Sequence, residues 1–598
     1  MAHTPISHRD DASTIEARSG AQVAGWARLR RYIPILDWLP TYKREHLPGD
    51  FIAGMALGVM AVPQSMAYAL LANLPPQVGL YATLAPLLVY AVFGTSRTLS
   101  IGPVALVSLL TGTMIAQLAP PQSAQAMQLA LLAALVVGVA QVALGAMRMG
   151  FVVNFLSHPV LSGFTSAAAV VIALSQVKNL FGIELPGSAS PLADLGHVIA
   201  RLPETNWVSL GMGVAAIVVI IFFHRRLGRA LVHLGVSEFV AAQVARSGGL
   251  VVVLVGTLLT WLLRLDQTAQ LRTVGHVPAG LPPFTMPVFD PSSLGAMAPA
   301  LVMLVVIGYV ESVSIAKSFA SRRREKVDAD QELIALGMAD IAASFTGGSP
   351  VSGSFSRSAV NFASGAATQL SSVFAAAVIA VALIFFTPMF YFLPETVLAA
   401  SIVAAVLNLP DFETARQAWR YSKADLLTLV ITLVGVLFVG VESGLLIGVA
   451  SSLAVHLWVT SRPHVTIIGR VEDTETYKSV KRHKVKTCPH VTALRIDESL
   501  YFATAKVLED TLIGVAVDNP ALKYIVLDCS AVNRIDLSAL TTLETVDNEL
   551  RTMGVTLVLS AVKGPIHDSL LRAGFVARFG QDRIYLSTHE AMKALECT

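Results

Sequence analysis

The sequence predicts an α-helical polytopic membrane protein that continues into a small α/β domain. Charge is the first indication, because residues 51–460 contain 36 Asp, Glu, Lys or Arg in 410 positions, about 9%. Residues 461–598 contain 34 in 138, about 25%, the level of an ordinary soluble domain. Apolar stretches of about 20 residues, long enough to cross a bilayer, recur along the first region. In the second region, short apolar runs alternate with helical patterns.

The overall composition excludes several classes of protein. A chain with 54% hydrophobic and 14% charged residues is not a single soluble enzyme, and a net charge of +3 indicates no nucleic-acid partner. Its three cysteines, Cys488, Cys529 and Cys597, lie in the polar end without metal-ligand spacing, which fits a reducing cytosol rather than a secreted disulfide protein. We expect no cofactor and no metal. We also expect no enzymatic activity, since no nucleophile–base pair or phosphate loop is visible.

A cytoplasmic N-terminal segment is predicted at residues 1–47, without a cleaved signal peptide. A transmembrane domain follows over residues 48–461, with fourteen spans arranged as seven and seven. Two spans, 98–116 and 350–364, are short and interrupted by Gly, Pro and Ser, and each is third in its half. The others are near 50–71, 77–94, 126–146, 151–177, 206–223, 247–264, 293–318, 330–345, 369–390, 392–409, 424–440 and 442–460.

The loop charges predict the orientation. Loops after even-numbered spans hold twelve Lys and Arg residues, whereas loops after odd-numbered spans hold three. The positive-inside rule therefore places both termini in the cytoplasm of a multi-pass membrane protein.

The polar end divides into a basic linker, 462–490, and an α/β domain, 491–598. The linker contains the run Lys478–Lys486 (KSVKRHKVK), interpreted as a solvated stretch near the anionic inner leaflet. In the domain the predicted strands are Val491–Ile496, Tyr524–Leu527 and Val555–Ser560, and the predicted helices are Val507–Val517, Leu537–Met553 and Ile566–Ala573.

The two short spans mark a candidate binding site. Interrupted segments at matching places in two halves indicate a site near the midplane of the membrane. They cover Gly94–Ala105 and Gly347–Ser358, where small polar stretches give way to helix-forming sequence. Pro103 is expected in a first helical turn, and Ser354 or Ser356 is expected to cap. Unpaired N–H groups at such helix starts bind anions.

Four motifs resemble the SulP anion-permease family: Val62–Tyr68 (VPQSMAY), Pro76–Pro86 (PQVGLYATLAP), Gly94–Pro103 (GTSRTLSIGP) and Ser352–Asn361 (SGSFSRSAVN). The polar end resembles the STAS domain that such permeases carry. The resemblance covers nearly the whole chain after residue 30 and suggests a bacterial member in the inner membrane. It implies a seven-plus-seven inverted repeat with core and gate domains, in a protein that is often dimeric. It also implies a STAS domain to which a cytoplasmic regulator can bind.

The resemblance also implies a substrate pocket between the two half-helices. Its residues would be Gln64 and Tyr68, which share a helix face, the backbone N–H groups of Val104 and Ala105, and Ser356 with Arg357. Simpler alternatives remain at this stage. Gln64 would make an interhelical hydrogen bond, Tyr68 would pack in the core, and Arg357 would pair with backbone carbonyls. Arg97, at the symmetric position, is left out of the site.

Glu311 is an intramembrane charge in the eighth span. A carboxylate there costs roughly 2.5–3.5 kcal/mol on insertion scales, so its presence suggests a function. Burial favours the protonated form of a carboxyl group, which makes Glu311 a candidate carrier of a coupling proton. The alternative is a salt bridge to Lys317 or Arg357.

Charge balance connects these residues. Two helix N-termini contribute about +0.5 each and Arg357 adds +1, so a protonated Glu311 leaves about +2, which suits a dianion. The sequence therefore predicts proton-coupled sulfate uptake by alternating access. Sodium-coupled bicarbonate transport is the runner-up, but that branch uses an Asp with a Thr four residues later, where this chain has Glu311 and Ile315. C4-dicarboxylate transport, a passive anion channel and a membrane-anchored regulator are further alternatives.

Ser538 follows a predicted strand and opens a helix. In STAS domains of anti-sigma-factor antagonists the equivalent loop carries a phosphorylated serine, so the resemblance implies a regulatory phosphosite. The alternative is that Ser538 only caps the helix.

Overall fold

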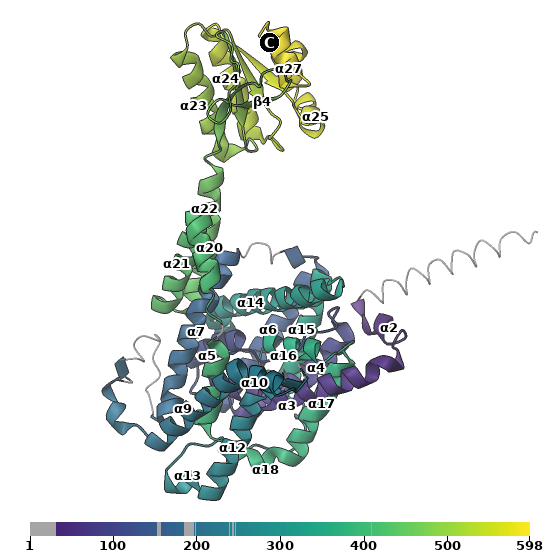
Figure 1. The fold of residues 1–598 in the computed structure, drawn as a ribbon, viewed down its shortest axis with the longest axis vertical. Coiled ribbons are helices and arrows are strands. Elements are labelled where there is room, and N and C mark those ends of the chain that lie inside the picture. The colour runs from purple at the N-terminus through teal and green to yellow at the C-terminus, as the bar shows by residue number, and fades with distance from the viewer. Residues whose placement is uncertain are drawn as a thin grey trace, which may run out of the picture. The chain divides into compact units, whose positions relative to one another are not determined.

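The structure is a computed structural model that describes residues 32–151, 157–183, 196–197, 199–237, 240–241, 244–245, 247–407 and 409–597 (Figure 1). Residues 1–31 of the predicted N-terminal segment and residues 152–156 of the predicted fifth span lie outside this range. The chain divides into two compact units, Met1–Ala450 and Ser451–Thr598, which are described separately.

Helices form at each of the fourteen predicted spans. Eight helices of the described residues are long and apolar enough to cross a membrane by length and composition. In the first half the helices are α3 (Leu47–Leu71), α4 (Pro76–Phe93), α5 (Ala105–Ala116), α6 (Ala124–Ala146), α7 (His158–Phe181), α9 (Trp207–Phe222), which η4 (Phe223–Leu227) and α10 (Gly228–His233) continue, and α12 (Gly248–Leu263).

The second half repeats this order. Its helices are α14 (Pro291–Arg323), α15 (Ala329–Phe345), α16 (Phe355–Ala363), α17 (Leu370–Val381) with its continuation η5 (Ala382–Phe386) and α18 (Thr387–Phe390), α19 (Glu395–Val406), α21 (Lys423–Phe438) and α22 (Val441–Thr460). Short helices lie between spans or before the first: α2 (Ile35–Trp38), η1 (Arg44–His46), η3 (Leu202–Glu204), α13 (Leu265–Thr268) and α20 (Phe412–Tyr421). Aspartates cap the second half's first two spans: Asp290 accepts from Ser292 N at 3.1 Å, and Asp328 accepts from Asp330 N at 3.0 Å.

The helices of the first unit pack in two groups. One group joins the first four spans of each half: α6 packs on α15, α3 on α17, α4 on α15, and α5 on α14. The second group joins the later spans, with α7 against α21 and α19, and α9 against α12 and α19. This is the expected division into core and gate domains. Each group combines spans from both halves, so neither half forms a separate body.

The crossing of α6 and α15 depends on two glycines. A Cβ added at Gly138 would lie 2.6 Å from the carbonyl oxygen of Gly337, and one added at Gly337 would lie 2.5 Å from that of Gly138. Such distances are too short for any side chain, so the two backbones are in direct contact.

Two short strands lie where the sequence predicted broken helices. β1 (Ile101–Gly102) precedes α5 and β2 (Ser352–Gly353) precedes α16. They pair antiparallel, with Ile101 opposite Gly353 and Gly102 opposite Ser352. The third span of each half is therefore a strand followed by a half-helix, and the two strands run in opposite directions, as an inverted repeat requires.

The second unit is built on a six-stranded sheet in the order β4-β3-β5-β6-β7-β8. Its strands are β3 (Val465–Arg470), β4 (Tyr477–Ser479), β5 (Val491–Ile496), β6 (Tyr524–Asp528), β7 (Thr556–Ser560) and β8 (Ile584–Tyr585). Helices α23 (Phe502–Asp518), α24 (Leu537–Thr552), α25 (Gly564–Arg572) and α26 (Phe575–Phe579) cover one face. On the other face, α27 (Thr588–Ala594) packs through Ala591 and Met592. η6 (Gln581–Arg583) precedes β8.

The structure corrects two details of the sequence analysis. Part of the segment 462–490, predicted as a linker, supplies strands β3 and β4 instead. The fold also brings Cys488 and Cys597 together as a disulfide beside His490, a grouping hidden by a sequence separation of 109 residues.

Candidate functional site

The two half-helices begin next to the β1–β2 pair. α5 starts after Val104, and no side chain caps its N-terminus. α16 starts after Ser354, whose hydroxyl accepts from the N–H of Arg357 at 3.4 Å, so Ser354 is the cap, one of the two residues expected. Pro103 lies before Val104 rather than in the first turn, contrary to our expectation. Its carbonyl oxygen is consequently available to other groups.

Arg357 is the largest side chain in the structure that is fully buried. Its Nη2 donates to the carbonyl oxygen of Pro103 at 3.1 Å, while Nε and Nη1 have no partner among the described residues. The expected backbone-carbonyl contact is therefore present, but it occupies only part of the guanidinium. Buried N–H groups left unpaired cost about 1–3 kcal/mol each, so these donors are suited to an oxyanion.

Gln64 and Tyr68 come from α3 and face the start of α16. The Gln64 amide nitrogen donates to the Tyr68 hydroxyl at 3.1 Å and to the Ser356 hydroxyl at 3.3 Å. Oε1 of Gln64 has no partner among the described residues. The interhelical hydrogen bond and the buried Tyr68 match the simpler alternatives, while the contact with Ser356 brings Gln64 to the first turn of α16.

Glu311 lies on α14 beside the same strands. The neighbouring Ser312 hydroxyl accepts from Gly353 N at 2.7 Å and lies 3.0 Å from the Ser352 hydroxyl, so this turn of α14 is fixed to β2. Oε2 of Glu311 is buried without a hydrogen-bond partner, and no ion pair within 4.0 Å joins Glu311 to Lys317 or Arg357. The described residues therefore do not form the direct salt bridge that was the alternative for Glu311.

These residues form one electrostatic group. Arg357 interacts electrostatically with Tyr68 and Glu311, although no ion pair joins them. Ser356 is exposed, and Gln64, Ala105 and Glu311 are partly exposed, whereas Arg357, Tyr68 and Val104 are buried. The group thus combines a buried cation with polar residues that are partly exposed.

Several buried polar residues to which the sequence analysis gave no role hold the strand segments in place. Asp340 accepts from Val351 N at 2.7 Å, just before β2. Glu332 accepts from Tyr90 OH at 2.7 Å and from Thr95 N at 2.8 Å, so α15 fixes the segment that leads to β1. The signal in the sequence was an acidic residue inside an otherwise apolar span.

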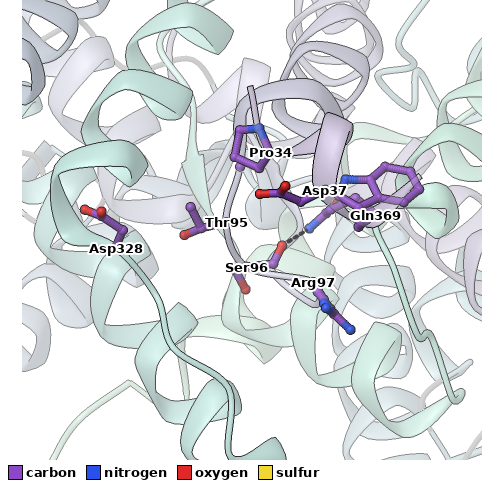
Figure 2. Close-up of a pocket in the computed structure, with 9 residues that line it drawn as sticks. Pro34, Asp37, Thr95, Ser96, Arg97, Asp328 and Gln369 are labelled. Atoms are coloured by element: carbon purple, nitrogen blue, oxygen red, sulfur yellow. Dashed lines mark hydrogen bonds between the residues drawn. The ribbon is translucent and has the colours of Figure 1, made fainter. Parts of the chain in front are cut away.

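A separate cavity of about 250 Å³ contains none of the predicted substrate residues (Figure 2). It lies where the segment after α4 approaches α2. Figure 2 shows the hydrogen bond that the Gln369 side-chain amide donates to the carbonyl oxygen of Ser96, and the nitrogen and oxygen lie 2.6 Å apart. Arg97 lines it, is half exposed, and pairs with Glu325 at 3.8 Å. This position agrees with leaving Arg97 out of the anion site.

In the second unit, Ser538 is exposed at the start of α24, next to a cavity of about 430 Å³. The residue that caps α24 is Asp536, which accepts from Ala539 N at 2.9 Å. Our alternative that Ser538 caps the helix is therefore wrong, because the cap lies two residues earlier.

Two facing half-helices within a bundle of interleaved halves define a membrane transporter of the inverted-repeat class. This chain belongs to the sulfate permease family, whose model matches residues 47–432. The STAS domain model matches residues 482–591.

Plant proteins are among the relatives of this chain. The chain is 34% identical over 617 residues to "Sulfate transporter 4.1, chloroplastic" of Arabidopsis thaliana, an alignment that covers 98% of this chain and 88% of the relative. It is 32% identical to "High affinity sulfate transporter 2" of Stylosanthes hamata, with 94% and 86% covered.

Solved structures share the fold. SLC26A9 superposes with a TM-score of 0.89 at 23% identity, covering 100% of this chain and 97% of the other. The murine Slc26a9 anion transporter in its inward-facing state gives 0.85 at 25% identity, covering 100% and 97%. The transmembrane domain of the cyanobacterial bicarbonate transporter BicA gives 0.57 at 20% identity, covering 69% and 98%.

Proposed function

We propose that this protein takes up sulfate, or another divalent oxyanion, together with a proton by alternating access. The observation that carries the proposal is the set of unpartnered polar atoms around the β1–β2 pair. Arg357 Nε and Nη1 and Glu311 Oε2 are buried, lack partners among the described residues and belong to one electrostatic group. Both named plant relatives are sulfate transporters.

Charge arithmetic favours a dianion with a proton. The N-termini of α5 and α16 contribute about +0.5 each, and Arg357 contributes +1. An ionised Glu311 reduces the total of about +2 to about +1, so a sulfate ion is best balanced when Glu311 is protonated. Gln64, Tyr68, Val104, Ala105, Ser356 and Arg357 would hold the anion, and Glu311 would carry the proton.

Sodium-coupled bicarbonate transport is less well supported. Ile315, four residues after Glu311, is buried and offers no oxygen to a sodium ion. C4-dicarboxylates have the same charge as sulfate and are therefore separated from it only by competition.

The proposal includes the cell membrane as location, with both termini in the cytoplasm. That orientation rests on the Lys and Arg bias of the loops. A homodimer and a regulatory phosphosite at Ser538 are further parts of the proposal.

Counterflow of labelled sulfate in proteoliposomes tests the function. Uptake should be competed by unlabelled sulfate, should increase at acidic external pH, and should not require Na⁺. Competition by bicarbonate with a requirement for Na⁺ would support the runner-up instead. Competition by fumarate would indicate dicarboxylates, and flux that cannot accumulate anion against a gradient would indicate a channel.

A further inference from the structure

We propose that Cys488, His490 and Cys597 form a reversible thiol–disulfide site in the STAS unit, in which His490 takes the proton from the attacking thiol. The two cysteines are bonded to each other in the structure. His490 Nε2 lies 3.2 Å from Cys597 Sγ, and its Nδ1 lies 3.7 Å from Cys488 Sγ. A disulfide and a base in direct contact are the components of a thiol-exchange site.

The Cys488 side of the site is rigid. The backbone of Cys488–His490 runs directly into β5, and the His490 carbonyl oxygen accepts from Lys523 N at 2.9 Å and from Tyr524 N at 3.1 Å. The Pro489 carbonyl oxygen accepts from the Asn519 side chain at 3.4 Å. His490 and Cys488 are therefore held on the sheet whatever the state of Cys597.

The Cys597 side lies at the end of α27. Cys597 N donates to the Met592 carbonyl oxygen at 2.9 Å, which turns the chain back toward the sheet. Ala591 and Met592 are buried against Val491 and Val526. The disulfide thus fastens the last helix of the domain to the first residues before β5, and opening it removes that covalent hold.

The backbone positions of the two cysteines suit a disulfide. The Cα atoms of Cys488 and Cys597 lie 5.8 Å apart, within the usual range for a disulfide. The loop that the bond closes has a sequence separation of 109 residues and contains most of the STAS unit. The linkage therefore constrains almost the whole domain.

The exchange is balanced with a small-molecule disulfide such as oxidised glutathione. One cysteine loses its proton to His490, and its thiolate attacks a sulfur of the small disulfide, whose S–S bond breaks as one thiolate leaves. The second cysteine then attacks the mixed disulfide and releases the other thiolate. The two cysteines lose two electrons, the small molecule gains them, and the two protons end on the released thiols.

The third cysteine provides an internal reference. Cys529 is buried, and burial raises the pKa of its thiol to about 12, so it has little thiolate at neutral pH. By contrast, Cys488, His490 and Cys597 are each partly exposed, which gives small thiols access. In the orientation proposed above this site faces the cytoplasm, where glutathione sets the redox balance.

Alkylation of the full-length protein in nanodiscs tests the proposal. The protein is equilibrated with mixtures of reduced and oxidised glutathione, denatured, alkylated with N-ethylmaleimide and weighed by intact mass spectrometry. We expect one added label under oxidising mixtures and three under reducing mixtures, in one step. Cys488→Ser and Cys597→Ser should each abolish the step, and Cys529→Ser should retain it with one label fewer. Three labels at every mixture would overturn the proposal.

The role of His490 is tested by rate. His490→Gln should form the disulfide about 10-fold more slowly at pH 7 and approach the wild-type rate above about pH 9, where thiols ionise without a base. Equal rates at pH 7 would contradict the role of His490. One equivalent of zinc in the purified protein that blocks alkylation of both cysteines would overturn the exchange site itself. Sulfate counterflow is measured in parallel, so failure of the proposed transport is distinguishable from failure of the redox site.

Discussion

Arg357 and Pro103 connect the two halves of the protein at the anion site, because the guanidinium of α16 donates at 3.1 Å to the carbonyl oxygen that precedes α5. This contact leaves the Nε and Nη1 atoms of Arg357 without a partner among the described residues. The guanidinium therefore has a structural role, as the donor to Pro103, and an electrostatic role, as a buried positive charge. Substitutions of Arg357 can separate the two roles.

Arg357→Gln should reduce the initial rate of sulfate uptake at least about 10-fold, since it removes a full positive charge from a buried site. Arg357→Lys should retain part of the activity, because it keeps the charge but lacks the planar fork. Uptake is measured in proteoliposomes at equal protein. The exposed Arg420→Gln serves as a charge-matched control, and an equal loss in that variant would contradict a local effect.

Glu311→Gln should keep sulfate binding and exchange but lose the dependence of uptake on external pH. Wild-type uptake should increase as pH falls, because the protonated carboxyl leaves the site with about +2. The amide mimics the protonated state permanently, so the pH profile should become flat. Accumulation that still follows the pH gradient in the variant would show that another group carries the proton.

Gly102→Ala should lower both activity and the melting temperature. Gly102 has φ +147°, and an added Cβ would lie 2.9 Å from Arg357 Nη2. Such strain costs on the order of 1–3 kcal/mol. Gly295→Ala is the matched control, since nothing lies within 4 Å of a Cβ there and alanine favours helix α14 by about 1 kcal/mol. Similar losses in both variants would refute the positional effect.

Gln64→Ala should raise the KM for sulfate by about 10-fold, because the site loses one hydrogen-bonding group of the order of 1.5 kcal/mol. Tyr68→Phe should have a smaller effect, as its ring keeps the packing of α3. Uptake measured over a series of labelled sulfate concentrations gives the KM of each variant. The exposed Gln125→Ala provides the baseline, and an unchanged KM for Gln64→Ala would exclude contact with the anion.

Asp536→Ala should destabilise α24 by about 1 kcal/mol, because it removes the capping carboxylate that accepts from Ala539 N. Ser538→Ala should change stability by less than about 0.5 kcal/mol, since the side chain is exposed. Hydrogen exchange of α24 in the full-length chain measures both. Equal destabilisation by the two substitutions would mean that Ser538 contributes to the helix start after all.

Much of the membrane unit was predictable because a continuous span of the hydrocarbon core needs about 20 apolar residues. The interrupted segments before Ala105 and Phe355 were equally visible, since Gly, Pro and Ser break an apolar run. The role of Pro103 was not, because its carbonyl oxygen accepts from Arg357 of α16, in the other half of the chain. No residue near Pro103 in the sequence indicates a contact with Arg357, which is 254 residues away.

The polar unit shows a similar limit. The strands after residue 490 were clear because their apolar runs are unbroken, as in Val491–Ile496. Strand β4 was missed because it lies at the edge of the sheet, which needs few apolar residues, and Tyr477–Ser479 is partly exposed. The pairing of Cys488 with Cys597 depends on where α27 ends, which only the folded sheet determines.

The pairing of Ile101 with Gly353 joins the two halves of the membrane unit without requiring a covalent connection between them. Spans from both halves interleave in each helix group, so neither half can bury its apolar faces alone. Breaking the peptide backbone between α13 and α14 would leave the strand ladder and every one of these helix contacts intact. Two separately translated fragments, ending and beginning in that connection, would therefore have to assemble into one transporter, and each fragment expressed singly would be left for proteolysis.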